Sequence, residues 1–238
     1  MFKRYFLLIG ALLVVAGAIF YVRGGTFSPS YGAHEEKSTY VIDVSVPRTT
    51  NNALNEAVTA YVNARAKEFA EMYAPEMFSE ADLENLGFND GRQYELSITG
   101  EAWDYNNLSG ISVLVYTYTG GAHGSTVYVP FMNDDVGTPV SLRDLFVPNA
   151  PYLERIAGDI QPTLREELEE GDMYVEEFFI EGTKPSEGNF FVDQIDDGGI
   201  TFVFQEYQVA PYAAGTPRTT VSLTSLTDIL NPTYFGKN

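Results

Sequence analysis

The chain has 238 residues, 33 of them acidic and 14 basic, and its formal net charge is −19. It contains no cysteine and only two histidines, His34 and His123. These counts exclude disulfide bonds, thiolate metal sites and thiol nucleophiles, and the strong negative charge disfavours binding to nucleic acid. The hydrophobic fraction of 45 % is sufficient for a folded core.

The N-terminus carries a membrane-targeting signal. An uncharged apolar run from Tyr5 to Val22 follows Lys3 and Arg4. Its length is close to the roughly 17 to 25 residues that span a bilayer core, which predicts a single-pass anchor with the rest of the chain outside the cytoplasm. The alternative is a cleaved signal peptide and a secreted protein, because the small residues around Ala18 are typical of a cleavage site. A buried helix is the third interpretation.

The sequence divides into four predicted parts. Residues 24–37 are rich in Gly, Ser and Pro, which predicts a tether in which His34 is inert. The chain beyond Arg23 has 11 of the basic residues and all 33 acidic ones, so it carries −22. The predicted parts are an anchor or signal peptide at 1–23, the tether at 24–37, a first unit at 38–138 and a second unit at 139–238.

In the first unit, Ser38 to Val46 alternates apolar and polar residues, as a half-buried strand does. Asn51 or Asn52 can cap an amphipathic helix that runs to about Tyr73, and residues 75–92 predict a long, partly helical connection. We expect an antiparallel meander with this helix on one face. The predicted strands of the meander are Tyr94 to Trp103, Ile111 to Tyr118 and Thr126 to Met132.

In the second unit, a short capped turn at 141–146 precedes a helix from about Pro151 to Glu170, and Pro162 must kink or divide that helix. A hairpin and a closing strand follow. A strand, a helix and strands thus occur twice, which predicts two consecutive strand-helix-antiparallel-sheet units of the α+β class. The predicted strands of the second unit are Asn189 to Val192, Ile200 to Gln205 and Arg218 to Leu223.

The first candidate site is the turn after the second strand of the meander. The segment from Tyr116 to Gly124 reads YTYTGGAHG, and its glycines permit positive φ angles at a tight turn. Two interpretations remain open: the glycines serve only the hairpin, or the turn presents a histidine beside tyrosines as a binding or acid–base site. The candidate residues are Tyr116, Tyr118, Gly120, Gly121 and His123.

The second candidate site follows a predicted strand. The segment from Phe204 to Gly215 reads FQEYQVAPYAAG and is an irregular apolar loop with two tyrosines. Tyrosine suits a recognition surface, because it offers a large contact area with few rotatable bonds, and it suits a packed core equally well. The candidate residues are Gln205, Tyr207, Pro211 and Tyr212.

Together the two segments resemble the extracellular domain of RsiV-like anti-sigma factors and the similar domain that precedes the catalytic module of PdaC-type peptidoglycan deacetylases. That family carries a Y-x-Y-T-G-G-A-H-G hairpin, matched by Tyr116 to Gly124, and a D-L-F element, matched by residues 144–146. An F-x-x-Y-x-x-A-P-Y-A-x-G segment follows, matched by Phe204 to Gly215. The resemblance covers about Ser38 to Leu230. It implies an extracytoplasmic bacterial pair of α+β units and, in RsiV, a sensor that binds lysozyme.

The ends of the sequence limit what this resemblance implies. Only Met1 to Arg4 precede the apolar run, so we expect no sequestration of a sigma factor. The sequence ends at Asn238, directly after the second unit, so we expect no deacetylase activity.

The sequence contains no G-x-S-x-G motif, Walker loop, H-E-x-x-H motif or dinucleotide fingerprint. The acidic run between Glu166 and Glu177 predicts a solvated surface rather than a metal site or a catalytic pair, and no cofactor is expected. We therefore predict a membrane-anchored, non-catalytic domain that binds a lysozyme-like cationic protein or a cell-wall component. The alternative is a peptidoglycan-modifying enzyme that uses His123 and nearby carboxylates.

Overall fold

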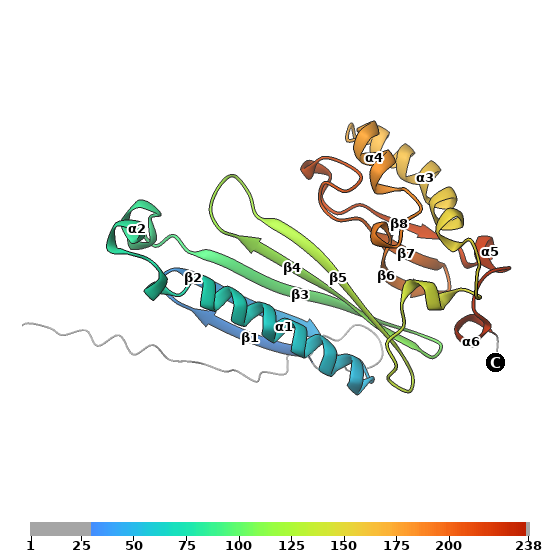
Figure 1. Ribbon diagram of the computed structural model, residues 1–238, viewed down its shortest axis with the longest axis horizontal. Helices are drawn as coiled ribbons and strands as arrows, with labels where there is room; N and C mark the ends of the chain where they lie inside the picture. The colour runs from blue at the N-terminus through green and yellow to red at the C-terminus, as the bar shows by residue number, and fades with distance from the viewer. Residues whose placement is uncertain (1–29, 237–238) are drawn as a thin grey trace, which may run out of the picture.

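The computed structural model describes residues 30–236 (Figure 1). They form a five-stranded sheet of order β1-β2-β3-β4-β5 and a three-stranded sheet of order β6-β7-β8, and helices accompany both. The predicted α+β class is confirmed. The predicted membrane segment, including Ala18, lies outside the described residues. Within 30–236, every helix is too short or too polar to traverse a bilayer.

The first sheet departs from a simple meander at one position. Its strands β2 and β3 are parallel, whereas the other neighbouring strands are antiparallel. Parallel neighbours need a long crossover, and α1 (Asn52–Met72) is the longest element in it. The strands are β1 (Ser30–Glu36), β2 (Tyr40–Pro47), β3 (Tyr94–Tyr105), β4 (Leu108–Tyr118) and β5 (Ser125–Asp134).

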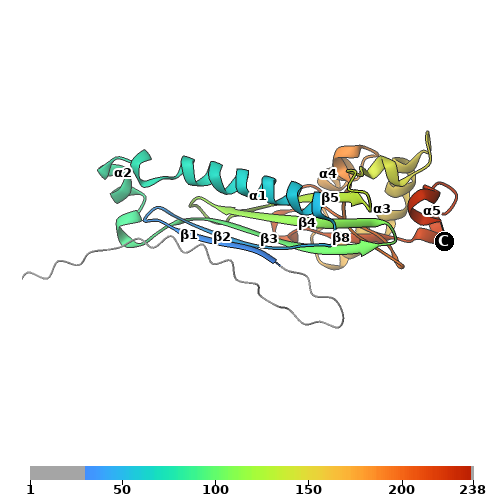
Figure 2. The ribbon, with the colours of Figure 1, turned by 90° about the horizontal axis from the view of Figure 1, so that it is seen from below.

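Helix α1 covers one face of this sheet, as predicted (Figure 2). The side chain of Asn51 caps the helix by accepting a hydrogen bond of 3.0 Å from the backbone N–H of Leu54. Alternate residues of β2, β3 and β4 point at the helix and form a buried core with Leu54, Val58, Val62 and Phe69. The predicted connection after α1 contains α2 (Glu80–Asn85) and the short 3-10 turns η1 (Pro75–Met77) and η2 (Phe88–Asp90).

The prediction of a tether up to residue 37 is wrong for residues 30–36. They form β1, which pairs with β2 along its whole length. Tyr31 donates to the Asn63 side chain of α1 at 2.6 Å, and His34 Nδ1 lies 2.7 Å from Asp43 Oδ1, so His34 is not the isolated side chain that was expected. An edge strand needs little apolar alternation, because much of it faces water. The polar, glycine-containing sequence of β1 therefore predicted a linker.

The second unit begins with a helix rather than a strand, which corrects the predicted repeat. The segment of the second unit before α3 (Tyr152–Glu170) forms only η3 (Leu142–Leu145) and two isolated bridges, at Pro139 and Phe146. Pro162 does not divide α3; the carbonyl that loses its helical partner belongs to Gly158, which is exposed, so water can replace the missing hydrogen bond. The remaining elements are α4 (Glu176–Gly182), η4 (Glu187–Asn189), β6 (Phe191–Asp196), β7 (Gly199–Val203), η5 (Tyr212–Ala214), β8 (Arg218–Val221), α5 (Leu223–Leu226) and α6 (Pro232–Phe235).

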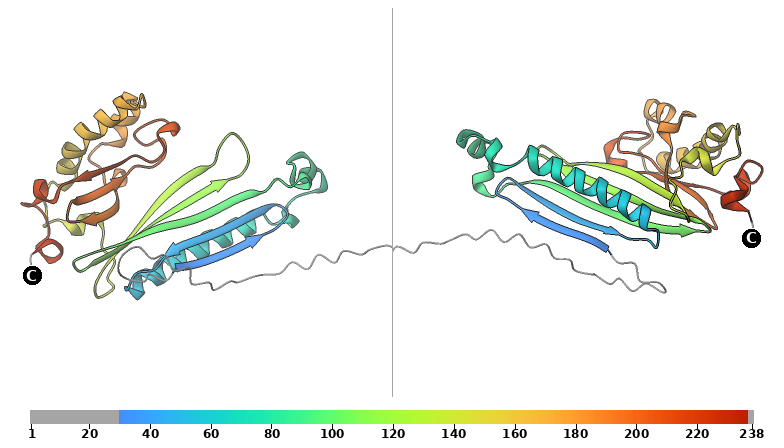
Figure 3. Two further views of the ribbon diagram at one scale, coloured as in Figure 1. Left: turned by 180° about the vertical axis from the view of Figure 1, so that it is seen from behind. Right: turned by 60° about the horizontal axis from the view of Figure 1, so that its bottom comes forward.

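The two sheets share a core at one end. Trp103, Leu108 and Met132, at the far ends of β3, β4 and β5, are buried in the same cluster as the apolar residues of α3, β6 and β7. Figure 3 shows the second sheet beside these strand ends. Gly110 is required there, because a Cβ atom at this position would lie 2.2 Å from the Trp103 ring. This shared core fixes the second unit relative to the first.

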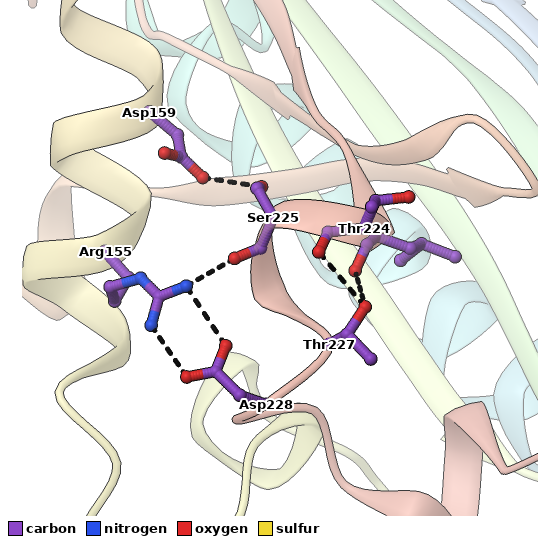
Figure 4. Close-up of polar contacts among 7 residues, drawn as sticks. Arg155, Asp159, Thr224, Ser225, Thr227 and Asp228 are labelled. Atoms are coloured by element: carbon purple, nitrogen blue, oxygen red, sulfur yellow. Dashed lines mark hydrogen bonds and ion pairs between the residues drawn. The ribbon is translucent and has the colours of Figure 1, made fainter.

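A polar network attaches the C-terminal segment to α3 (Figure 4). The Arg155 guanidinium donates to both carboxylate oxygens of Asp228, at 3.0 and 3.1 Å, and to the backbone carbonyl of Ser225. The Ser225 hydroxyl donates to Asp159 at 2.6 Å. The chain that leaves β8 is therefore held against the helix that covers its sheet.

Candidate binding site at the junction of two loops

The two segments singled out in the sequence meet in space. The His123 ring, in the β4–β5 loop, stacks on the Tyr212 ring with centroids 3.8 Å apart and planes inclined by 21°. Tyr207 lies next to them, with its ring centroid 5.7 Å from that of Tyr212. Figure 1 shows the β4–β5 loop and the loop before β8 facing each other. We call this cluster of His123, Tyr207 and Tyr212 the loop junction.

Glycines shape the β4–β5 loop, as predicted. Gly120 and Gly121 have φ angles of +88° and +96°, which other residues rarely adopt. Gly124 is needed for a different reason: a Cβ atom there would lie 2.4 Å from the Tyr116 ring. Tyr116 thus packs over the backbone next to His123 and fixes where the loop turns back into β5.

The hydrogen bond of His123 fixes its orientation. Its Nδ1 lies 2.8 Å from the Gly124 carbonyl, which can only accept, so Nδ1 carries a proton. Within the described chain, no carboxylate makes a hydrogen bond or ion pair with this imidazole. A carbonyl partner and a stacked ring orient a histidine for contact, whereas a carboxylate partner is what a general base usually has.

Tyr212 is half-buried beneath His123, and Pro211, which caps η5, is half-buried as well. Partial burial, and after it the nearby Glu206 carboxylate, raises the pKa of the Tyr212 phenol. The hydroxyl therefore keeps its proton at physiological pH, and the ring acts as an apolar surface with a polar tip.

Tyr207 is the exposed member of the junction, with 49 % of its surface accessible. Its φ angle of +64° is in the left-handed region, which a bulky residue adopts only where its surroundings impose it. Here the surroundings do so through Gln208, whose Nε2 donates to the carbonyls of Gly182 and Asn189 and whose Oε1 accepts from Gln205 N–H. The turn thus fixes the backbone from which the exposed tyrosine side chain projects.

Gln205 has a structural role that its position in the motif did not reveal. Its side-chain amide accepts from the N–H of Tyr128 at 2.9 Å and donates to the Tyr128 carbonyl at 2.8 Å. Glu206 likewise accepts from Thr126 N–H at 3.0 Å. These side chains occupy the free edge of β5 and hold the two loops together, a role that sequence reasoning missed because the partners are about 80 residues apart.

A second feature missed from the sequence lies beside the junction. Arg218 Nε donates to the buried carboxylate of Asp193 at 2.8 Å, and the same guanidinium donates to the hydroxyl of Tyr128 and lies 5.1 Å from its ring centroid. Arg218 and Asp193 belong to β8 and β6 of the second unit and Tyr128 to β5 of the first, so the contact of Arg218 with Tyr128 also joins the units. No local sequence signal links them.

The remaining predicted residues lie elsewhere. Tyr118, Gly120 and Gly121 line a groove of about 670 Å³ on the side of the β4–β5 loop that meets α2. The predicted set is thus divided between the loop junction and this groove. In residues 30–236, no group of three or more histidine, aspartate or glutamate side chains is placed to hold a metal ion.

Two known families match consecutive parts of the chain. Residues 33–126 match the family described as Deacetylase PdaC, and residues 143–224 match a family of unknown function, DUF3298. The peptidoglycan-N-acetylmuramic acid deacetylase PdaC of Bacillus subtilis (strain 168) is 32 % identical over 124 residues, which are 51 % of this chain and 26 % of that protein. The chain thus spans about a quarter of the length of the deacetylase it matches.

Crystal structures of DUF3298 family proteins have a similar fold. One from Bacteroides fragilis has a TM-score of 0.58 and 21 % identity, with 87 % of this chain and 95 % of that chain covered. One from Pseudomonas aeruginosa PAO1 has a TM-score of 0.57 and 15 % identity, with 89 % and 97 % covered. The resemblance to the domain of PdaC-type deacetylases that the motifs predicted is confirmed, and DUF3298 proteins share the fold. His123 lies in one matched segment and Tyr212 in the other.

Proposed function

We propose that this chain, which resembles PdaC over its first unit and DUF3298 proteins over its second, is a non-catalytic binding domain of the bacterial cell envelope. The observation that carries the proposal is the stack of His123 on Tyr212, beside which a rigid turn holds Tyr207 in solvent. Fixed, exposed tyrosines lose little conformational entropy on binding, so they are common anchors of recognition surfaces.

The geometry of the loop junction favours recognition over acid–base chemistry. In catalytic triads a carboxylate stabilises the protonated histidine, whereas the Nδ1–H of His123 donates a hydrogen bond to a neutral carbonyl. A peptidoglycan-modifying activity would appear as turnover of wall fragments that His123→Ala abolishes in a folded protein. We expect neither the unmodified chain nor the variant to turn over such fragments.

Charge and resemblance together indicate a cationic partner. The chain beyond Arg23 carries −22, and opposite charges accelerate encounter and make it sensitive to salt. In the RsiV-like family that the motifs resemble, the partner is lysozyme, so a lysozyme-like cationic protein is the partner we propose. A neutral wall component is the competing ligand, and its binding would not weaken as salt rises.

The apolar leader places this activity outside the cytoplasm in our proposal. The run from Tyr5 to Val22 is long enough for an anchor, and cleavage near Ala18 would release the domain instead. Fractionation of cells that express the full chain separates the two routes, because an anchored chain stays in the membrane pellet with its leader.

Calorimetric titration of the full chain with lysozyme at low ionic strength tests the proposed partner. We expect binding that weakens as salt is added and that Tyr207→Asn reduces by about tenfold or more. Asparagine tolerates a positive φ angle, so this variant removes the ring without straining the turn. Val136→Asn is the matched control, because Val136 is 81 % exposed on the turn after β5. Absence of binding would count against this partner, and equal losses for both variants would count against the loop junction.

A further inference from the structure

The groove beside the β4–β5 loop is lined by one positively charged side chain, that of Arg92. It has a volume of about 670 Å³ and is lined by Arg92, Tyr94 and Tyr118, by Asn85, Leu86 and Gln93, and by residues 119–121. This volume is in the range of about 300 to 1,000 Å³ that is common for small-molecule sites. Figure 1 shows α2 and the β4–β5 loop at the same end of the first sheet.

Arg92 differs from the other basic residues that the structure describes, because their side chains have protein partners. Residues 30–236 contain ten lysines and arginines and all 33 acidic residues of the chain. Eight of the ten form ion pairs with carboxylates. Arg48 makes an interaction as well, which leaves Arg92 as the one described cation without a protein partner. In so acidic a chain, an unpaired guanidinium in a groove is available to an external anion.

The backbone holds Arg92 in this position. Gly87 and Gly91 have φ angles of +77° and +85°, and the N–H of Arg92 donates to the Gly87 carbonyl at 3.1 Å. A Cβ atom at Gly87 would lie 2.8 Å from Cδ of Arg92, so the stem of the arginine packs directly over the glycine. The tight turn therefore presents the guanidinium to the groove.

The tyrosine walls are also held in place. The Tyr94 ring packs edge-on against Phe88 and Tyr73, with centroids 5.0 and 4.9 Å apart. The Tyr118 hydroxyl donates to the Gly121 carbonyl at 3.2 Å. Ordered aromatic rings around a single cation suit a flat apolar group that carries one negative charge.

We propose that this groove is a second binding site, which takes a small organic carboxylate with a flat or aromatic body. The carboxylate pairs with the Arg92 guanidinium, whose planar fork matches its two oxygens, and the body lies against Tyr94 and Tyr118. His123, Tyr207 and Tyr212 do not line this groove, so its test does not use the partner proposed above.

Saturation-transfer NMR on the full chain tests this site with N-acetyl-L-tyrosine as the probe and N-acetyl-L-tyrosinamide as its neutral analogue. We expect transfer to the ring protons of the acid and binding of the amide that is weaker by roughly tenfold or more, since a charge-assisted hydrogen bond contributes about that factor or more. Arg92→Gln should weaken binding of the acid by the same factor and leave the amide unchanged, and Arg92→Lys should have an intermediate effect.

Lys67→Gln is the matched control. It removes the same charge from an exposed position on α1, so it reports any effect of net charge alone, and it should not change binding of the acid. Equal affinity for acid and amide, or an acid affinity that Arg92→Gln leaves unchanged, would overturn the proposal. So would the absence of transfer from the acid at about 10 mM, where a ligand with a Kd of about 1 mM occupies most sites. Circular dichroism of each variant shows whether it is folded.

Discussion

His123 and Tyr212 are 89 positions apart in the sequence, and their rings stack at a centroid distance of 3.8 Å. The histidine belongs to the segment that matches PdaC and the tyrosine to the segment that matches DUF3298. Neither unit alone can form this surface. Under the proposed function the two units therefore act as one recognition module, and their relative position is part of the candidate site.

The stack should contribute to stability as a coupled pair. In a double-mutant cycle with His123→Ala and Tyr212→Ala, we expect a coupling free energy of about 0.5 to 1.5 kcal/mol, which is typical of aromatic pairs. The measurement is the free energy of unfolding in urea for the four proteins. Additive effects would show that the rings touch without stabilising each other.

Two glycines should respond to alanine in opposite ways. At Gly124 a Cβ atom would lie 2.4 Å from the Tyr116 ring, so Gly124→Ala should lower the free energy of unfolding by about 1 to 3 kcal/mol. Gly158 is an exposed position of α3 with open space around its Cα, so Gly158→Ala should raise stability by about 0.5 to 1 kcal/mol. Thermal unfolding of both variants checks the signs, and a neutral Gly124→Ala would contradict the packing of Tyr116.

Removing the side-chain amide that pairs with β5 should weaken the link between the units. Gln205→Ala leaves the N–H and the carbonyl of Tyr128 without these partners, so we expect a loss of about 1 to 3 kcal/mol in unfolding free energy. Gln194→Ala is the control, because exposed Gln194 bonds only to the nearby Asp196 side chain. Amide exchange at Thr126 and Tyr128 should accelerate in the first variant alone. Unchanged exchange there would contradict the role assigned to Gln205.

The pairing of β1 with β2 should depend on pH through His34. Its hydrogen bond to Asp43, opposed by slight burial, raises the pKa of the imidazole above 6.5. A raised pKa in the folded state means that the contribution to stability is complete below pH 6.5 and is lost as pH rises through the folded pKa. An NMR titration of His34 should show this raised value, and Asp43→Asn should return it toward 6.5. An ordinary pKa in the unmodified chain would contradict the contact.

Regular elements with a strong local pattern could be predicted from the sequence. The alternation of Tyr40, Ile42 and Val44 and the capping residue Asn51 correctly placed β2 and α1. Strand β1 could not be found in this way, because its edge position removes the need for apolar alternation. The prediction that Pro162 kinks or divides α3 considered only the lost helical hydrogen bond, whereas the exposure of Gly158 to water reduces the cost of that loss.

The candidate site was predictable in composition but not in arrangement. The glycines and tyrosines of both loops predicted them as candidate sites, since turns need glycine and recognition surfaces are rich in tyrosine. The stacking of His123 on Tyr212 and the bonds from Gln205 to Tyr128 depend on how the two sheets pack, which no local pattern encodes. For the same reason, the free guanidinium of Arg92 became recognisable only when every other described cation could be examined for a partner.

Hydrogen exchange of the full chain, with and without lysozyme at low ionic strength, tests the central claim most directly. The account predicts simultaneous protection of residues 119–124 and 204–217, with protection of both segments lost in Tyr207→Asn. Protection confined to one of these segments, or found only on distant elements such as α1, would contradict recognition by the joined loops.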